Sequence, residues 1–323
     1  MQSLQATMIN SDTKEYTVVR LNKDNLKDVA LLHEAVYGAA TLPDYFPKKY
    51  NTAYTGCEYA GFIAYNTQRI PVAYYGVIPC FIQQGTEIIL AAQSADTMTH
   101  PQHRYKGMFV DLSNLTFELC RALGIHLIFG FPNQNSYHGA VNKLGWKLTE
   151  MMDCFMIPIS GLRIESFANR FSFSKNFYNR YIKTILKKYI INQKGIPNSV
   201  TKENFAGVYR DAAYLEYKTY SPARVIRIGD SKIWINIKSG FLIGDIEGVD
   251  EKNFTEVMNT IKSLAKRLGV KQVQFHCSPG TSLHTLFSLH YKAIPSYPAL
   301  FQDFGSTIPP EKIKFTLADI DVF

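Results

Sequence analysis

The junction at residues 99–109, THPQHRYKGMF, constrains the fold of this chain more than any other stretch. The apolar residues 86–99 precede it and predict a strand, and residues 108–123 carry leucines at helical spacing and predict a helix. Two basic residues and Gly107 stand between them. The first turn of a helix has unpaired N–H groups and the positive end of the helix dipole. We therefore expect this loop to bind an anion.

Length and composition favour two globular domains with a polyanionic partner. The 323 residues are 46% apolar, and the formal net charge is +8 with a pI of about 9.0. We expect domains at residues 1–160 and 201–323, joined by a basic helical connector at 161–200. For the helix within that connector, at residues 175–194, we favour a solvated face over a surface that binds a membrane or RNA.

Cysteine spacing and hydropathy favour a cytoplasmic protein. No two of the five cysteines are spaced as a metal or redox motif, so we expect buried free thiols and no metal. The opening residues are polar, and no apolar run approaches the length of a membrane span.

The first half predicts the order β-α-β-β-β-α-β-α-β. Strands are expected at 16–21, 59–66, 70–82, 86–99, 125–131 and 146–159, and helices at 25–38, 108–123 and 135–145.

The second half has a similar pattern. A strand meander is expected at 223–248, a helix at 253–269, a strand at 270–279, a helix at 282–291 and a last strand at 313–323. Its loop before the long helix, EGVDEKNF, is acidic where the first half is basic. We therefore expect a nucleotide-containing ligand in the first half alone.

The basic junction resembles the acyl-CoA pyrophosphate loop of the GNAT (Gcn5-related N-acetyltransferase) superfamily, [QR]-x-x-G-x-[GA]. Arg104, Gly107 and the preceding His-Pro match, whereas Phe109 stands where a small residue is usual. Residues 133–146, NQNSYHGAVNKLGW, resemble the next motif, an Asn-led helix that ends in Gly and an aromatic residue. The resemblance covers residues 16–158.

The resemblance implies an α/β fold of two tandem GNAT-like domains, each a mixed, mostly antiparallel sheet flanked by helices. The layout is similar to enhanced-intracellular-survival-type acetyltransferases and to GNAT proteins encoded with bacterial surface-polysaccharide enzymes. The implied activity is acetyl transfer from acetyl-CoA to an amine. The residues that it places at the cofactor are Thr97, Met98, Thr99, Arg104, Tyr105, Lys106, Gly107, Met108, Phe109 and Asn135.

The proton-transfer residues of the family are altered here. The tyrosine acid that usually precedes the Gly-aromatic pair by four residues is replaced by Val141, and Tyr137 lies one helical turn earlier on the same face. Gln93 stands where some relatives carry a glutamate base. Asp96 is close, although regular strand alternation predicts that it faces the side opposite Gln93.

The sequence ends DIDVF, and a terminal carboxylate serves as base in enhanced-intracellular-survival-type enzymes. The resemblance therefore makes Phe323, Asp319 and Asp321 candidate bases. The alternative is an ordinary edge strand with a frayed end.

The sequence is compatible with three functions. The first is an acyl-CoA-dependent N-acyltransferase that acts on a primary amine of a small molecule such as an amino sugar, and we expect Tyr-rich loops at 36–60 and 291–301 to line its cleft. The second is a Fem-type aminoacyl-tRNA-dependent transferase. The sequence has no heptad-bearing arm, so this function, and a nucleic-acid partner with it, is less favoured. The third is a non-catalytic acyl-CoA-binding protein.

Overall fold

The computed structural model describes residues 16–161 and 172–323, so residues 162–171 of the expected connector lie outside the described part. The chain forms two compact units. Unit 1 comprises Met1–Thr149 and Pro298–Pro310, and unit 2 comprises Glu150–Tyr297 and Glu311–Phe323. Two strands, β6 (Lys147–Pro158) and β12 (Ala293–Asp303), therefore contribute residues to both units.

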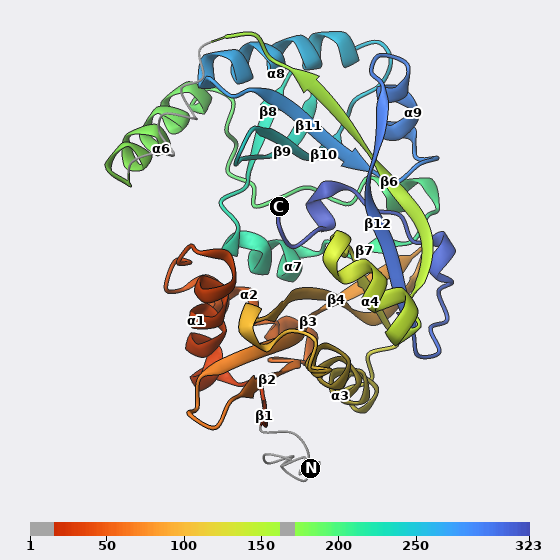
Figure 1. Cartoon of the computed structure of the whole chain (residues 1–323). Coiled ribbons are helices and arrows are strands. Elements are labelled where there is room, and N and C mark those ends of the chain that lie inside the picture. Colours follow the sequence, from red (N-terminus) through yellow and green to blue (C-terminus); the bar gives the residue numbers. More distant parts are fainter. Residues whose placement is uncertain (1–15, 162–171) are drawn as a thin grey trace. The chain divides into compact units, whose positions relative to one another are not determined.

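Unit 1 contains a mixed sheet in the order β1-β2-β3-β4-β5-β12 (Figure 1). All neighbouring strands in it are antiparallel except β4 and β5, which are parallel. The strands that complete it are β1 (Thr17–Arg20), β2 (Gly61–Tyr65), β3 (Pro71–Gln84), β4 (Glu87–Thr99) and β5 (Leu127–Gly130). Its helices are α1 (Leu26–Tyr37), α2 (Tyr45–Lys49), α3 (Met108–Ala122) and α4 (Gln134–Leu144).

The helices of unit 1 cover both faces of its sheet. Tyr74 and Tyr75 are neighbours on β3 and so point to opposite faces. Tyr75 lies in the hydrophobic cluster formed with α3 and α4, and Tyr74 lies edge-on to Tyr50, just after α2. The apolar spacing of residues 108–123 therefore predicted α3 correctly, because its leucine face packs on the sheet.

Unit 2 repeats this plan with the order β6-β11-β10-β9-β8. Only β10 and β11 are parallel in it. Its strands are β8 (Arg224–Ile228), β9 (Ser231–Ile237), β10 (Phe241–Glu247) and β11 (Gln272–Cys277), with the two-residue β7 (Gly207–Val208). Its helices are α6 (Ser172–Leu186), α7 (Ala212–Tyr217), α8 (Phe254–Leu268) and α9 (Ser282–Ser288). The core lies between the sheet and α8, whose apolar face is buried.

Several expectations about elements are wrong. The basic helix predicted at 175–194 ends at Leu186. Residues 291–301, predicted as a loop, fall mostly in β12. Residues 313–323, predicted as a last strand, instead form short 3-10 turns, Pro310–Lys312 (η6) and Leu317–Asp319 (η7), with isolated bridges at Ile313 and Thr316. The sequence pattern also missed α2 within the expected loop 36–60.

Candidate active site

A bulge in β4 lies directly before the basic loop. The β3 partner of Met98 is Tyr74, but the partner of Ala95 is Gly76, so Asp96 and Thr97 together stand opposite one β3 residue. Asp96 adopts a φ of 51°, in the left-handed region. A bulge of this kind bends a strand and leaves backbone groups outside the ladder.

The bulge also separates β4 from its other neighbour. The parallel pairing with β5 covers only Ala91–Gln93, whereas β4 continues to Thr99. Thr97, Met98 and Thr99 therefore lie beyond the end of this pairing, at a strand edge where amide groups of an extended ligand can pair with the backbone.

The bulge places Asp96 on the face that carries Gln93, so the sequence prediction of opposite faces is wrong. Gln93 is the partner of Ile78, which lies on the same face of β3 as Tyr74. Asp96 contacts the residues at the end of α2 on that same face, since the extra residue of the bulge reverses the alternation of β4.

Asp96 is bound by two groups that sequence reasoning missed. Its Oδ2 lies 2.7 Å from Nζ of Lys49, whose side chain is 1% exposed, and accepts a hydrogen bond of 2.8 Å from the Tyr50 hydroxyl. Burial, reinforced by the charge of Asp96, raises the pKa of Tyr50 well above its usual value. The other oxygen, Oδ1, has no hydrogen-bond partner among the described residues, and 15% of the Asp96 side chain is exposed. The face of β4 that carries Gln93 thus has a carboxyl group with one oxygen that accepts no hydrogen bond from the described residues.

The basic loop runs from β4 to the N-terminus of α3. Gly107 is the residue before α3 and has a φ of 80°, a conformation that glycine adopts at low cost. Tyr105 also has a positive φ, 65°, and is fully exposed. Arg104 and Lys106 are exposed, and Nε of Arg104 donates to the carbonyl of Thr99 at 3.4 Å. The loop therefore presents two cations and free helix N–H groups at one place.

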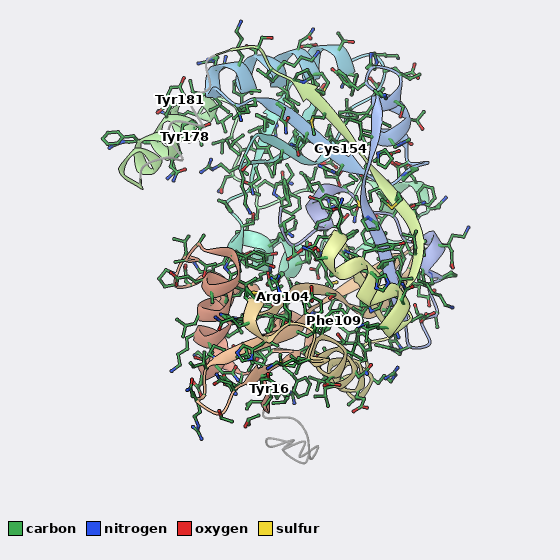
Figure 2. All side chains as sticks on the ribbon, in the orientation of Figure 1. Tyr16, Arg104, Phe109, Cys154, Tyr178 and Tyr181 are labelled. Carbon is green, nitrogen blue, oxygen red and sulfur yellow. The ribbon has the colours of Figure 1, made fainter. Side chains whose placement is uncertain are left out.

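Tyr16, which is labelled in Figure 2, contacts two residues of the loop. Its hydroxyl lies 3.1 Å from Nδ1 of His103, and the Lys106 ammonium lies 5.6 Å from the centre of its ring. Burial, together with the charge of Lys106, lowers the pKa of His103, so this imidazole is neutral at pH 7. The positive charge of the loop therefore comes from Arg104 and Lys106.

Phe109, the departure from the family pattern, is accommodated by Gly139. The Phe109 ring lies in the first turn of α3 and packs edge-on against Tyr75. A Cβ atom on Gly139 of α4 would lie 2.9 Å from this ring. The bulky residue is thus matched by a missing side chain on the facing helix.

The Asn-led helix α4 begins as the motif predicts, with Asn133 as its cap, and the placement of Asn135 at the cofactor stays a prediction. The Asn133 side chain accepts hydrogen bonds from the N–H groups of Asn135 and Ser136, and Asn135 is exposed. Tyr137 and Val141 both pack against the cluster that includes α3, as their spacing predicts. The Tyr137 hydroxyl has no hydrogen bond within the described ranges.

The last residues of the sequence lie in unit 2. Phe323 is 1% exposed, and its ring contacts Trp234. Its main-chain oxygen accepts hydrogen bonds from Ser221 and, at 3.1 Å, from Asn236. Asp319 is ion-paired with Arg210 at 2.7 Å. The role of Phe323 as a base stays a prediction.

Two features are absent from the described residues. Within residues 16–161 and 172–323 no group of His, Cys, Asp and Glu is arranged to hold a metal ion. The helices of the same residues include none with the length and hydropathy of a membrane span. All five cysteines are buried free thiols, as predicted, and burial raises the pKa of Cys154 to about 11.

The comparisons with known proteins agree with this geometry. Residues 17–149 match the family model described as an acetyltransferase (GNAT) domain. No curated protein sequence matches the chain at a significant level.

Among solved structures, a probable N-acyltransferase from Enterococcus faecalis superposes with a TM-score of 0.58 at 11% identity, covering 90% of this chain and 73% of its own. A putative acetyltransferase from Pyrococcus horikoshii gives 0.55 at 12% identity and covers 95% of both chains. The N-myristoyltransferase of Saccharomyces cerevisiae with bound myristoyl-CoA gives 0.54 at 11% identity, over 93% of this chain and 84% of its own.

These structural likenesses show a shared fold, and the family model covers the residues that build the bulge, the basic loop and α4. Residues 17–149 therefore match a GNAT domain, and the rest of the chain shares the fold of the solved structures.

Proposed function

We propose that the protein is an acyl-CoA-dependent N-acyltransferase. The observation that carries this proposal is the succession of a bulged β4, a loop with Arg104 and Lys106, and the α3 N-terminus at Gly107. This succession offers a strand edge for the pantetheine amides and a cationic, N–H-rich end for the pyrophosphate. Acetyl is the acyl group we propose, and the five buried thiols suit the reducing cytoplasm.

The chemistry follows from the same residues. The acceptor nitrogen bonds to the thioester carbonyl carbon while the carbon–sulfur bond breaks and CoA thiolate leaves. A free backbone N–H at the bulge, beside Thr97, stabilises the developing oxyanion. The Tyr137 hydroxyl gives its proton to the thiolate. Asp96 binds the ammonium of the acceptor at Oδ1 and takes one proton from it before attack, since Lys49 and Tyr50 occupy Oδ2. The second proton that the nitrogen loses as the amide forms restores the Tyr137 hydroxyl.

A small-molecule amine is the acceptor class that we propose, with an amino sugar as the first candidate. The Tyr-rich segment 36–60 supports it, because tyrosine rings offer an apolar wall with a polar tip to a sugar. A panel of nucleotide-linked amino sugars, polyamines and peptide amines, read out by thiol release from acetyl-CoA, tests this choice. Reaction with peptides alone would exclude the sugar.

The decisive experiment is a calorimetric titration with acetyl-CoA on Gly107→Glu. The new carboxylate faces the pyrophosphate at the helix N-terminus, so we expect affinity to fall by about 100-fold or more. Gly124→Glu is the matched control: Gly124 follows the other end of α3, has a similar φ of 73°, and has open space around it. The control should bind acetyl-CoA as the unsubstituted protein does. Equal binding by the two variants would reject the site.

Thiol release distinguishes an enzyme from a binding protein. If acetyl-CoA binds at Gly107 but no amine of the panel accelerates thiol release, the non-catalytic alternative stands and the acyltransferase proposal fails.

A further inference from the structure

Unit 2 has its own bulge at the position in its sheet that corresponds to the β4 bulge. On β10, Ile243 pairs with Ile235 and Asp245 with Trp234, so Gly244 is the extra residue. The parallel pairing of β10 with β11 stops at Ile243, as that of β4 with β5 stops at Gln93. The two strands of unit 2 therefore part at the level where unit 1 offers its strand edge to acyl-CoA.

In unit 2 this gap is filled by residues 315–323. The N–H of Ser278, just after β11, donates to the carbonyl of Phe315, and Thr316 forms a bridge with Cys277. The turn η7 then packs against both β10 and β11. The segment thus continues along the edge of β11 and lies between the two parted strands.

The ring of Phe323 lies on the bulge itself. A Cβ atom on Gly244 would come within 2.3 Å of this ring, so only glycine leaves room for it. Trp234 contacts the ring edge-on, with 5.6 Å between centroids. Both aromatic residues are 1% exposed. The ring therefore occupies enclosed apolar space at the bulge.

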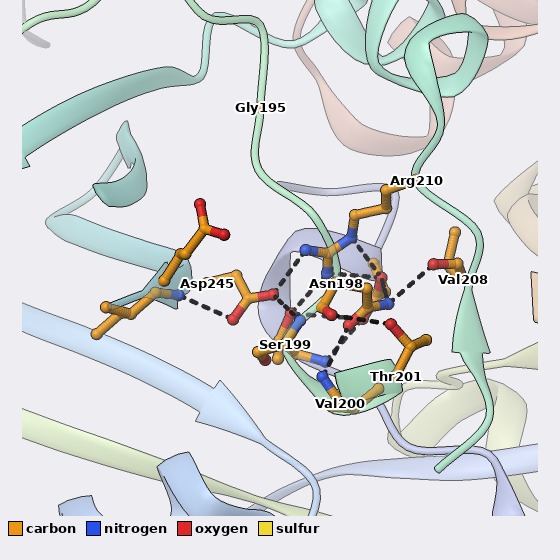
Figure 3. Close-up of polar contacts among 12 residues, drawn as sticks. Gly195, Asn198, Ser199, Val200, Thr201, Val208, Arg210 and Asp245 are labelled. Atoms are coloured by element: carbon orange, nitrogen blue, oxygen red, sulfur yellow. Dashed lines mark hydrogen bonds and ion pairs between the residues drawn. The ribbon is translucent and has the colours of Figure 1, made fainter. Parts of the chain in front are cut away.

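Buried polar contacts hold the segment in place (Figure 3). The Arg210 guanidinium joins Asp319 of the segment, at 2.7 Å, to Asp245 of β10, at 2.6 Å, and all three side chains are fully buried. Lys218 donates to the carbonyl of Ile320 at 2.9 Å, and Asn236 to the Phe323 oxygen. Segment and bulge are thus linked by charge as well as by ring packing.

The loop before α8 gives an independent indication. Where unit 1 carries Arg104 and Lys106, unit 2 carries Asp250 and Glu251, whereas both helices have one acidic residue in the first turn. Carboxylates at a helix N-terminus compete with a pyrophosphate for the same N–H groups and repel its charge.

We infer that residues 315–323 are an intramolecular ligand of unit 2, which occupies the groove at the β10 bulge and leaves unit 1 as the sole acyl-CoA site. One acyl-CoA then binds per chain, an expectation that rests on the proposed function. Phe323 accordingly serves as the anchor of this ligand.

The occupancy test does not require acyl-CoA. The chain has 2 tryptophans, so Trp146→Phe leaves Trp234 as the only indole reporter beside the Phe323 ring. In that background Phe323→Ala should red-shift the Trp234 emission and lower Tm by roughly 6–15 °C. Toluene should restore part of the loss, because an apolar cavity left by a ring binds small aromatic molecules. Unchanged emission and Tm would overturn the inference.

Gly244→Ala is the complementary variant. Its methyl group should expel the Phe323 ring and produce the same red shift, without a toluene response, because the methyl group excludes toluene as it excludes the Phe323 ring. Gly161→Ala is the matched control, since a Cβ atom there has its nearest neighbour, on Lys266, at an ordinary 3.4 Å. If Phe323→Ala fails to fold, the milder Phe323→Leu carries the emission test. A Gly244→Ala variant that behaves as Gly161→Ala does would also overturn the inference.

The stoichiometry of acetyl-CoA binding tests the second part of the inference, that unit 1 holds the sole acyl-CoA site. Calorimetry with acetyl-CoA should give one site per chain, and Gly107→Glu should leave none. A second site, or a full site that survives Gly107→Glu, would overturn the inference while acyl-CoA binding stands. Absence of any binding by the unsubstituted chain would instead reject the proposed function, and the Trp234 experiment would still decide occupancy.

Discussion

At the scale of single residues, Tyr137 is the hydroxyl that packs on the α3–α4 side of the sheet with no partner in the described part of the chain. If it protonates the leaving thiolate, Tyr137→Phe should lower turnover by about 10²–10⁴-fold and leave acetyl-CoA affinity nearly unchanged. Steady-state kinetics with thiol detection and a calorimetric titration measure the two quantities. Tyr181→Phe, at an exposed tyrosine of α6 in unit 2, is the control and should keep both. Full turnover in Tyr137→Phe would assign the proton to water.

His276 gives unit 2 a dependence on pH. Burial lowers the pKa of this imidazole to about 4, and its ring is 8% exposed on β11. In the unfolded chain the same group titrates near 6.5, so protons favour unfolding as the pH falls from 6.5 toward 4. We expect a loss of roughly 3 kcal/mol in the free energy of unfolding across that window, from this group alone.

Urea unfolding at pH 7.5 and at pH 4.5 measures this loss. His276→Gln removes the titrating group, and the difference between the two pH values should shrink accordingly. The control is His138→Gln, on the exposed face of α4, which should keep the full difference. Identical pH dependence in His276→Gln would show that the imidazole is protonated in the folded state.

At the scale of elements, the ion pair between Lys49 and Asp96 links the end of α2 to the β4 bulge. Removing one partner of a buried pair leaves an uncompensated charge and typically costs 3–5 kcal/mol. Lys49→Met should therefore lower the free energy of unfolding by about that amount, as measured by urea denaturation. Lys48→Met is the matched control because Lys48 pairs with Asp44 on the surface, where the cost is below about 1 kcal/mol.

The double variant Lys49→Met/Asp96→Asn makes this test specific. It removes both charges, so part of the stability should return, and the two changes should not be additive. Additive losses would mean that the pair does not couple α2 to the bulge.

Sequence periodicity correctly predicted the elements that bury one apolar face against the core. The α3 residues Leu112 and Leu119 are buried at helical spacing, and Gly124 follows the helix with a φ of 73°. The sequence pattern did not predict β12, because Pro295 and Pro298 lie within it and proline in an apolar run argues against a strand. Residues 313–323 were wrongly predicted as a strand. The consecutive residues Leu317–Ile320 are all buried, so their apolar character does not indicate the one buried face of a strand.

The candidate site was predictable where its chemistry is local. The loop with Arg104 and Gly107 carries its signal within a few residues, and so does the start of α4. The bulge at Asp96 depends on the register with β3, and Lys49 finds its partner 47 positions later in the chain. A side chain such as Lys49, which reads as a surface lysine, becomes a buried group only through that distant contact.

At the scale of the whole molecule, unit 1 is discontinuous. Leu300 of β12 pairs with Gly130 of β5 and is fully buried in the cluster that includes α3. The Phe304 ring lies 5.8 Å from that of Phe117, and the Arg121 guanidinium lies 4.2 Å from its centre. Residues 17–149, the range of the family match, therefore lack one strand and part of their own core.

A fragment of residues 16–149 should accordingly fail to fold alone. We expect poorly dispersed amide resonances and strong binding of a hydrophobic dye, because the edge of β5 and the Leu300 site are uncovered. A synthetic peptide of residues 298–310 should restore dispersion, and the same peptide with Leu300→Asp should not. A well-dispersed spectrum of the fragment alone would show that β12 is dispensable to unit 1.

Shared strands also have a consequence for how the chain is made. A ribosome releases β5 long before β12, so the edge of β5 waits for its partner while almost all of unit 2 is being translated. Unit 2 in turn waits for residues 311–323. Neither unit can therefore finish before the other is largely synthesised, and the order of translation imposes no order of completion. Nascent chains should carry two unfinished cores at once, and dependence on chaperones should be greatest until residues 298–323 have been synthesised.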